Sequence, residues 1–360
     1  MLPPAGKKVV TVDARKINHF GIGNVIRSIF EALLTSNKYS PVALGSRSEI
    51  LKAFKNISAL NFDVKPNNPF GFLFLNRLLA RCPAACHINT FYVGVNNLLV
   101  PSVLFFYDLI HLKHPRHFLH GFLASKLMSR ALKTSSVVVV LSEAVKKELE
   151  NYFPNLRLNI ITLKPPVKHN FRNLGEDPKQ ILNRKEDFYL LVCSNLKPHK
   201  GVFDLLSLWK DSYPLLVVVA RGSKKLDSYQ KSNVRILSDF LSEEALMELY
   251  IKARYLVIPS YEEGFGFCFL ESRFTYTPVI ARPLPVFFDF ATRWDLLAED
   301  CSNQALDQAI KQSFTKTYDE DIAQDFKKLQ INYSPEQFRD DLEDVLDFLT
   351  YDSYCSRLAT

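Results

Sequence analysis

The chain has 360 residues, 47% of them hydrophobic, which is enough apolar material for two ordinary domain cores. No apolar run reaches the ~18 residues of a membrane-spanning helix, and residues 1–12 have too little apolar content for a signal peptide, so we expect a cytoplasmic protein. The six cysteines show no metal-type pairing, and we expect Cys82 and Cys86 to pack in a core, which predicts neither a metal site nor a disulfide.

The net charge of +7 is divided unevenly along the chain. Residues 1–170 hold 22 Lys and Arg against 8 Asp and Glu, a net +14, whereas residues 171–360 hold 23 against 30, a net −7. A basic first half can meet anionic lipid head groups, a phosphorylated acceptor or nucleic acid, and it is equally explained as a surface that keeps the protein soluble. The asymmetry favours two domains with different partners.

The first predicted unit is a strand, a glycine turn and a helix. Residues 7–12 are predicted to form the strand and residues 24–34 an amphipathic helix, with Gly21-Ile-Gly23 as a tight turn between them. Gly21 and Gly23 would let the backbone close over a phosphate or a sugar. The third glycine of the dinucleotide fingerprint is missing, which argues against a dehydrogenase.

Two later segments of the first half carry candidate functions. Residues 70–81 combine phenylalanines and leucines with two arginines, and either lie on a membrane surface or, as we expect, pack in the core. Residues 103–108 are predicted to form a buried strand that ends at Asp108, where ligands bind in open parallel sheets, and His111 follows at once. Asp108 and His111 are therefore candidate catalytic residues, although a lone histidine is more often structural.

A basic helix is predicted over residues 116–133. It is the strongest candidate for contact with an anionic surface, through Arg116, Lys126, Arg130 and Lys133. A buried strand follows at residues 136–141, with Ser142 as the expected cap of the next helix. Residues 164–178 are proline-rich, lose the apolar periodicity and are predicted to be the linker between two domains.

The second half opens with a strand at residues 188–193, a polar turn, and a helix at residues 202–209. Lys200 lies just before this helix, where a cation would neutralise a pyrophosphate. Further strands are expected at residues 215–220 and 233–237, and Ser242 is expected to cap a helix over residues 243–251.

The most informative stretch of the chain is Tyr261-Glu-Glu-Gly-Phe-Gly-Phe-Cys-Phe-Leu-Glu271. It follows a buried strand at residues 253–258 and turns through Gly264 and Gly266 into a helix, whose free N–H groups suit a diphosphate. Glu263 and Glu271 flank the turn, so one can hold sugar hydroxyls and the other ribose hydroxyls. The plainer alternative is a solvated loop glutamate and a helical glutamate in a surface ion pair.

These motifs resemble a known family. Pro259-Ser260 followed by Glu263-Gly-Phe-Gly-Phe and Glu271 is similar to the Glu, seven residues, Glu signature of retaining, group 1 nucleotide-sugar glycosyltransferases with the GT-B fold. The run from Asn195 to Lys200 resembles the family's Asn-x-x-Pro-x-Lys element, whose lysine contacts the donor phosphates. The resemblance implies the donor-binding residues Gly21, Gly23, Asn195, Lys200, Phe240, Leu241, Glu263, Gly264, Phe265, Gly266, Phe267, Cys268 and Glu271, with Phe240 and Leu241 at the nucleobase unless they pack in the core.

Two positions depart from the family pattern. Tyr107 stands where the family usually has a histidine of the sugar pocket, so that Tyr107 or His111 supplies the polar contact, or activity is reduced. Pro285 is followed by Val286 where the family usually has a Pro-Glu pair. These departures leave a catalytically silent sugar-nucleotide-binding protein open as an alternative, and a nucleotide-sugar epimerase is another.

The resemblance implies an α/β protein with two Rossmann-like domains facing a central cleft. We expect an acceptor-binding domain at residues 1–170, a donor-binding domain at residues 171–334 and a C-terminal helical segment, residues 335–360, that returns to the first domain. The expected activity is metal-independent, retaining transfer of a hexose, most simply mannose from GDP-mannose, to a glycan or glycolipid acceptor. Glu263, Lys200, Asp108 and His111 are the expected catalytic residues. An anionic membrane surface is the further expected partner, and nucleic acid is not.

Overall fold

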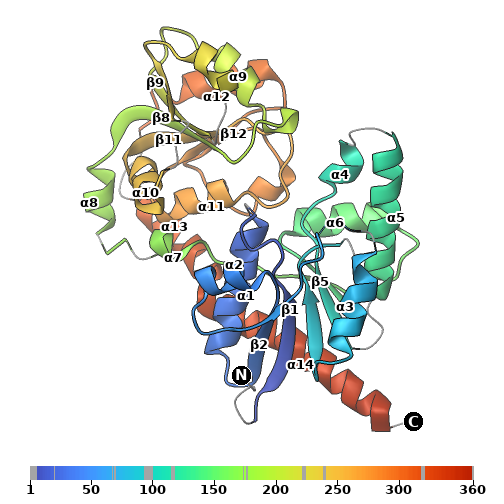
Figure 1. Cartoon of the computed structure of the whole chain (residues 1–360). Helices are drawn as coiled ribbons and strands as arrows, with labels where there is room; N and C mark the ends of the chain where they lie inside the picture. The colour runs from blue at the N-terminus through green and yellow to red at the C-terminus, as the bar shows by residue number, and fades with distance from the viewer. Residues whose placement is uncertain are drawn as a thin grey trace. The chain divides into compact units, whose positions relative to one another are not determined.

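The computed structural model describes residues 6–358, apart from residues 20, 67, 69, 93–99, 115–117, 173, 176, 221–223, 238–240 and 318–320. The chain divides into two compact units, one of residues 1–166 with 333–360 and one of residues 167–332. Each unit is built around its own parallel sheet (Figure 1). No described helix is both long and apolar enough to cross a bilayer.

The first unit contains a seven-stranded sheet in the order β3-β2-β1-β4-β5-β6-β7, in which all neighbouring strands are parallel. The strands are β1 (Lys8–Asp13), β2 (Tyr39–Gly45), β3 (Ser58–Asn61), β4 (Cys86–Asn89), β5 (Ser102–Phe105), β6 (Val137–Val140) and β7 (Ile160–Thr162). The helices are α1 (Ile22–Thr35), α2 (Arg47–Ala53), α3 (Gly71–Leu79), α4 (Ile110–Lys113), α5 (Phe118–Thr134), α6 (Glu143–Tyr152) and α14 (Pro335–Leu358). Strand β6 is four consecutive buried valines, as expected for a strand covered on both faces.

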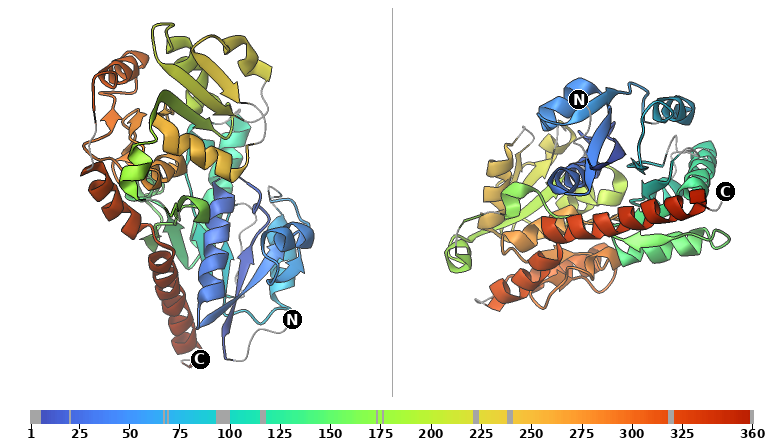
Figure 2. Two further views of the ribbon diagram at one scale, coloured as in Figure 1. Left: turned by 90° about the vertical axis from the view of Figure 1, so that its left-hand side faces the viewer. Right: turned by 90° about the horizontal axis from the view of Figure 1, so that it is seen from below.

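The last helix, α14, returns to the first unit. It lies beside α1, and Figure 2 shows it as the long red helix next to the blue one. The Tyr39 hydroxyl donates a hydrogen bond to Asp347 Oδ1 at 2.7 Å, and the Lys38 ammonium lies 2.7 Å from Asp347 Oδ2. The expected return of the C-terminal helix to the first domain is therefore confirmed.

The second unit contains a six-stranded parallel sheet in the order β10-β9-β8-β11-β12-β13. The strands are β8 (Glu186–Cys193), β9 (Leu215–Ala220), β10 (Val234–Leu237), β11 (Ala253–Ile258), β12 (Val279–Ala281) and β13 (Leu296–Leu297). The α-helices are α7 (His169–Arg172), α8 (Pro178–Leu182), α9 (Val202–Leu208), α10 (Glu243–Lys252), α11 (Phe267–Phe274), α12 (Asn303–Gln312) and α13 (Asp321–Asn332). The 3₁₀ helices are η1 (Pro198–Lys200), η2 (Lys224–Tyr229) and η3 (Pro285–Phe287).

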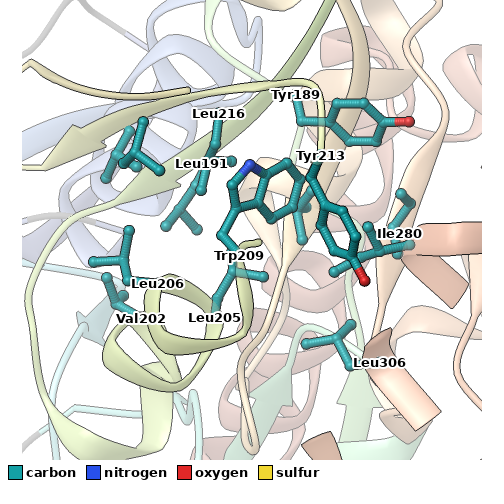
Figure 3. Close-up of a cluster of buried hydrophobic side chains, with 14 of the residues drawn as sticks. Tyr189, Leu191, Val202, Leu205, Leu206, Trp209, Tyr213, Leu216, Ile280 and Leu306 are labelled. Atoms are coloured by element: carbon teal, nitrogen blue, oxygen red, sulfur yellow. The ribbon is translucent and has the colours of Figure 1, made fainter. Parts of the chain in front are cut away.

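Aromatic side chains form the centre of the second unit's core (Figure 3). Trp209 is buried with its ring 5.4 Å from that of Tyr189 and 5.6 Å from that of Tyr213, and its Nε1 donates to the Pro214 carbonyl at 2.9 Å. The Tyr213 hydroxyl donates to Asp307 Oδ1 at 2.6 Å. Because each polar end has a partner, these large rings can be buried without leaving an unsatisfied group. They join β8 and β9 to α12.

One sequence-based prediction of local structure was incomplete and another was wrong. Residues 164–178 are predicted to be the linker, and the division between the two units does fall within them, after Pro166, but they also contain α7 and the first residue of α8. Helix α8 starts there because Asp177 accepts a bond from Lys179 N at 2.8 Å and Gln180 reaches back to Asp177 N, which together form a capping box. The strand expected to end at Asp108 ends at Phe105, and Asp108 instead accepts a bond from Ile110 N at 3.0 Å ahead of α4.

The expected core packing of residues 70–81 is half correct. Helix α3 buries Gly71, Leu75 and Leu79, but Phe70, Leu73 and Phe74 are exposed on its other side. The predicted helix of residues 116–133 is α5, which starts at Phe118. Arg116 lies outside the described residues.

Candidate functional site

The glycine turn between β11 and α11 forms the floor of the candidate site. Gly266 has φ +96°, a left-handed conformation, and a Cβ at this position would lie 2.8 Å from Cε1 of Phe287. Only glycine satisfies both conditions, because side chains rarely adopt this φ and the Phe287 ring is buried beneath the turn. Helix α11 starts at the next residue, so its first N–H groups, which have no acceptor within the helix, face outward from the turn.

Lys200 and Glu263 are brought together at this turn from positions 63 residues apart. Lys200 Nζ lies 2.7 Å from both carboxylate oxygens of Glu263, and the Ser260 hydroxyl donates to Glu263 Oε1 at 2.7 Å. Both charged side chains are less than one-fifth exposed. Burial by itself lowers the pKa of Lys200, but the Glu263 carboxylate outweighs burial and raises that pKa, so the lysine stays protonated.

A second glycine holds Lys200 in place. Gly201 has φ +62°, and a Cβ there would collide with the carbonyl oxygen of Pro259. The two backbone segments are therefore packed against each other, and Tyr261 N donates to the His199 carbonyl at 2.8 Å on the same side. This close approach lets the turn after β8 and the turn after β11 share one site.

Glu271 is inside the unit and 6% exposed, so the surface ion pair considered from sequence is excluded. Its Oε2 accepts a hydrogen bond from the Tyr250 hydroxyl at 3.0 Å. Burial raises the pKa of Glu271 to about 7, against smaller effects of Lys168 and the Tyr250 hydroxyl that lower it. A carboxylate held this way is stabilised when a ligand brings further hydrogen-bond donors, such as sugar hydroxyls.

The other predicted donor-binding residues differ in how much of each side chain is exposed. Phe265 is buried, with its ring 4.8 Å from Phe267 and 5.3 Å from Phe290, so its side chain packs in the core. Cys268 is half-buried, and burial raises the pKa of its thiol to about 12, so the thiol is neutral at physiological pH.

Three further predicted donor-binding residues lie in the turns around this site or outside the described ranges. Asn195 accepts a bond from Lys197 N at 3.1 Å and shapes the turn ahead of η1. Leu241 is half-buried. Phe240 lies outside the described residues.

Several other candidates belong to the first unit. Gly23 has a local reason to be glycine, because a Cβ there would collide with the Ile17 carbonyl oxygen, and Gly21 precedes α1 with φ +70°. His111 lies in α4, where its Nδ1 is 3.0 Å from the Tyr92 hydroxyl. Within the described residues the Tyr107 hydroxyl is buried without a hydrogen-bond partner, and burial raises its pKa. Lys126, Arg130 and Lys133 are exposed on α5.

Sequence reasoning missed Tyr250 and the structural role of Gly201, and quoted Ser260 without assigning it a function. Ser260 lies three residues before Glu263, so its spacing was a usable signal, whereas Tyr250 is on α10 and its contact depends on the tertiary fold. The presence of valine at position 286, in place of the family's usual glutamate, also has an explanation. Val286 is buried in η3 next to Phe287, whose ring lies against Gly266. In the described ranges no group of three or more His, Cys, Asp or Glu is arranged to hold a metal ion.

Each of the two units is an α/β domain built on a parallel sheet. The second unit also combines a glycine turn, a lysine–glutamate pair and a buried glutamate. This fold and this site define a protein of the GT-B class. A solved glycosyltransferase from Rickettsia africae matches with a TM-score of 0.70 at 15% identity, covering 95% of this chain and 98% of that one. HepE from Anabaena in complex with UDP-glucose matches with a TM-score of 0.69 at 16% identity, covering 95% and 100%. At these identities the likeness shows the fold.

Residues 175–328 match the family model described as glycosyl transferases group 1. A curated relative, the O-antigen chain mannosyltransferase RfbU of Salmonella typhimurium, is 28% identical over 223 residues, or 59% of this chain. The match spans 61% of the length of that relative. The family-model match lies in the second unit, where the motifs around Lys200, Glu263 and Glu271 resemble the same family.

Proposed function

We propose that the chain is a retaining glycosyltransferase that moves mannose from GDP-mannose to a glycan or glycolipid acceptor, in the synthesis of a surface polysaccharide or lipopolysaccharide. The match of residues 175–328 to the model of glycosyl transferases group 1 supports glycosyl transfer, and the similarity to an O-antigen chain mannosyltransferase supports mannose and this class of acceptor. A GDP-linked donor is the simplest source of mannose. The protein would bind this nucleotide sugar in the cytoplasm.

The observation that carries the proposal is the arrangement of Lys200, Glu263 and α11 around Gly266. The Lys200 ammonium has three N–H donors, and its contact with both oxygens of Glu263 leaves donor capacity for a phosphate oxygen. The free N–H groups at the start of α11 offer a second set of donors to the same diphosphate. Negative charge that develops on the leaving diphosphate is thereby stabilised by groups already in position.

Glu263 would then position the sugar. Its carboxylate is held by Lys200 and Ser260, so it is oriented before the donor arrives and accepts hydrogen bonds from sugar hydroxyls. Glu271, deeper in the unit, would accept bonds from the ribose. In a front-face displacement with retention the protein mainly orients the donor and stabilises the leaving group, and Lys200 with α11 supplies the charge that the step needs.

Nucleotide release distinguishes this function from its alternatives. The protein is incubated with GDP-mannose, UDP-glucose and UDP-N-acetylglucosamine in turn, with and without lipid-linked oligosaccharide acceptors, and released nucleotide and new sugar nucleotides are measured. We expect GDP release that depends on acceptor and continues in EDTA. Formation of a new sugar nucleotide without acceptor would indicate an epimerase, and binding without turnover on any acceptor would indicate a silent binding protein.

Glu271→Ala tests the assignment of the ribose. We expect donor affinity to fall by about 1.5–3 kcal/mol for each lost charge-assisted hydrogen bond, as measured by calorimetric titration with the intact nucleotide sugar. Binding of the free sugar phosphate, which has no ribose, should be unaffected. Unchanged nucleotide-sugar affinity in a folded variant contradicts the assignment.

A further inference from the structure

Helix α3 is apolar on both of its sides, which is unusual for a surface helix. One side is buried through Leu75 and Leu79. On the other side Phe70, Leu73 and Phe74 are 64%, 56% and 55% exposed. These positions have the i, i+3, i+4 spacing of a single helical face, so solvent meets a contiguous apolar stripe and not isolated side chains. A stripe of this kind marks a surface that something else covers.

Helix α5 continues this surface with a mixed apolar and basic stripe. Phe122 and Leu123 are 56% and 52% exposed, and the exposed cations Lys126, Arg130 and Lys133 follow at steps of three or four residues. Lys126 Nζ lies 5.5 Å from the centre of the Phe122 ring. The Arg130 guanidinium lies 4.1 Å over the Phe72 ring, and this contact joins α5 to α3. We call the five exposed apolar side chains of the two helices and the three α5 cations the aromatic–basic face.

The charge of this region is strongly one-sided. Residues 64–142, which include both helices, contain eight Lys and Arg and a single acidic residue, Asp108. Neither helix contains an Asp or a Glu. The next helix of the same unit, α6, has the sequence EAVKKELENY and mixes both signs, as a solvated helix does. The aromatic–basic face therefore matches a partner that is apolar and anionic together.

We propose that the aromatic–basic face docks on the surface of a lipid bilayer that contains anionic lipids. The aromatic and leucine side chains enter the head-group boundary while Lys126, Arg130 and Lys133 contact lipid phosphates, with their aliphatic stems along the apolar surface. A second copy of the chain fits poorly, because a two-fold contact would bring the same positive face against itself. A polynucleotide offers phosphates but no apolar medium for Leu73 and Leu123.

The use of this surface rests on the proposed function, since a glycolipid acceptor would be reached from the membrane. Its test does not, because vesicles without donor or acceptor suffice. The full chain is sedimented with vesicles of phosphatidylcholine alone or with phosphatidylglycerol added at about one-third of the lipid, over a series of salt concentrations. We expect binding only with the anionic lipid, and release as salt rises. Binding that ignores both lipid charge and salt would overturn the proposal.

Charge variants identify the surface that binds. Lys126→Glu, Arg130→Glu and Lys133→Glu together should lower partitioning onto anionic vesicles by at least ~100-fold. The matched control reverses three exposed lysines elsewhere, Lys147, Lys327 and Lys328, with the same change in net charge. The control should bind much more tightly than the triple variant of α5. Equal loss in both variants would mean that net charge alone is responsible, and would overturn the proposal.

A fluorescence experiment tests the apolar part. The two native tryptophans, Trp209 and Trp294, are buried in the second unit and should not be quenched by lipid. Phe122→Trp places a third indole on the aromatic–basic face, and Phe348→Trp places one at a 48% exposed position on α14. Lipids with brominated acyl chains should quench only the first of these two introduced indoles. Equal or absent quenching would overturn the proposal, as would a lipid-independent dimer that shields the indole on α5 and disappears on Phe74→Ser.

Discussion

The two units of this protein both bury and expose charged side chains, but they differ in which charged side chains gather together. In the second unit Arg273, Arg282 and Glu271 are buried, and Lys185 is enclosed by acceptors such as Thr277 Oγ1 at 2.6 Å. In the first unit the cations of α5 are exposed, and the buried ion pair is Asp13 with Arg15 at 2.6 Å. Buried charges organise a site for one ligand, whereas exposed charges of one sign attract an extended surface.

The structure also corrects the charge comparison made from halves of the sequence. Residues 333–360 carry seven Asp and Glu but belong to the first unit, through α14. Counted by unit, residues 167–332 carry 22 basic and 23 acidic residues, so the donor-binding unit is close to neutral. The acidity of the second half is thus mostly that of a helix docked on the first unit. The positive excess of the first unit remains over α3 and α5.

The largest effect on stability is expected from breaking the buried ion pair of the second unit. Arg273 and Asp295 lie 2.7 Å apart with side chains 0% and 1% exposed, and Asp295 also accepts from Val279 N. Asp295→Ala leaves the guanidinium buried and unpaired and should lower the free energy of unfolding by about 3–5 kcal/mol. Denaturant unfolding followed by tryptophan fluorescence reports this unit, since both tryptophans lie in it.

A matched change on the surface sharpens the contrast. Arg293 and Asp321 form an ion pair at 3.2 Å with both side chains more than 60% exposed. Asp321→Ala should change stability by less than about 1 kcal/mol. If both aspartate variants lost the same stability, burial would not be the cause of the Arg273–Asp295 pair's larger contribution to the free energy of unfolding.

An intermediate effect is expected from Glu271, and it depends on pH. Its folded-state pKa of about 7 is above the ordinary value of 4.5, so the folded protein prefers the protonated carboxyl. The corresponding stabilisation is complete below pH ~4.5 and is lost as the pH rises through ~7. Relative to wild type, Glu271→Gln should gain up to about 2–3 kcal/mol between these pH values. Urea unfolding of both proteins across this range measures the difference, and parallel curves would contradict the shifted pKa.

A smaller effect than that of Glu271 is expected where α14 docks on the first unit. Tyr39→Phe removes the hydroxyl that donates to Asp347 and keeps the buried ring. Stability should fall by about 0.5–1.5 kcal/mol. Asp347→Asn, which keeps an acceptor for the tyrosine but removes the charge next to Lys38, serves as the control. A loss above that of Asp295→Ala would show that the returning helix, and not the core of the second unit, limits stability.

Much of the fold could be predicted from sequence because its signals are local. The valines of β6, the cap Ser142 bound to Val145 N at 3.3 Å and the cap Ser242 bound to Ala245 N at 3.1 Å are all short-range patterns. Glu263 and Gly266 were found in the same way, since they share one loop.

The remaining features depend on residues far apart in the chain. Lys200 and Glu263 were each predicted from sequence to be site residues, but their direct contact was not predicted. The hydrogen bond from Tyr250 to Glu271 arises only when α10 packs in the folded unit. Residue 201 must be glycine only because the turns after β8 and β11 are packed against each other. Helix α3 shows the same limit, because its composition is apolar on both sides and gives no indication of which side is covered.

The proposed function depends most on Lys200, which is held by Glu263 and would act on the donor diphosphate. Lys200→Ala tests this role against Lys197→Ala, which removes an exposed lysine from the same turn and leaves the site intact. With GDP-mannose and acceptor, the turnover number should fall ~10²–10³-fold for Lys200→Ala and stay at the wild-type value for Lys197→Ala. Equal turnover in the two variants, with both folded, would contradict the role of Lys200 at the diphosphate.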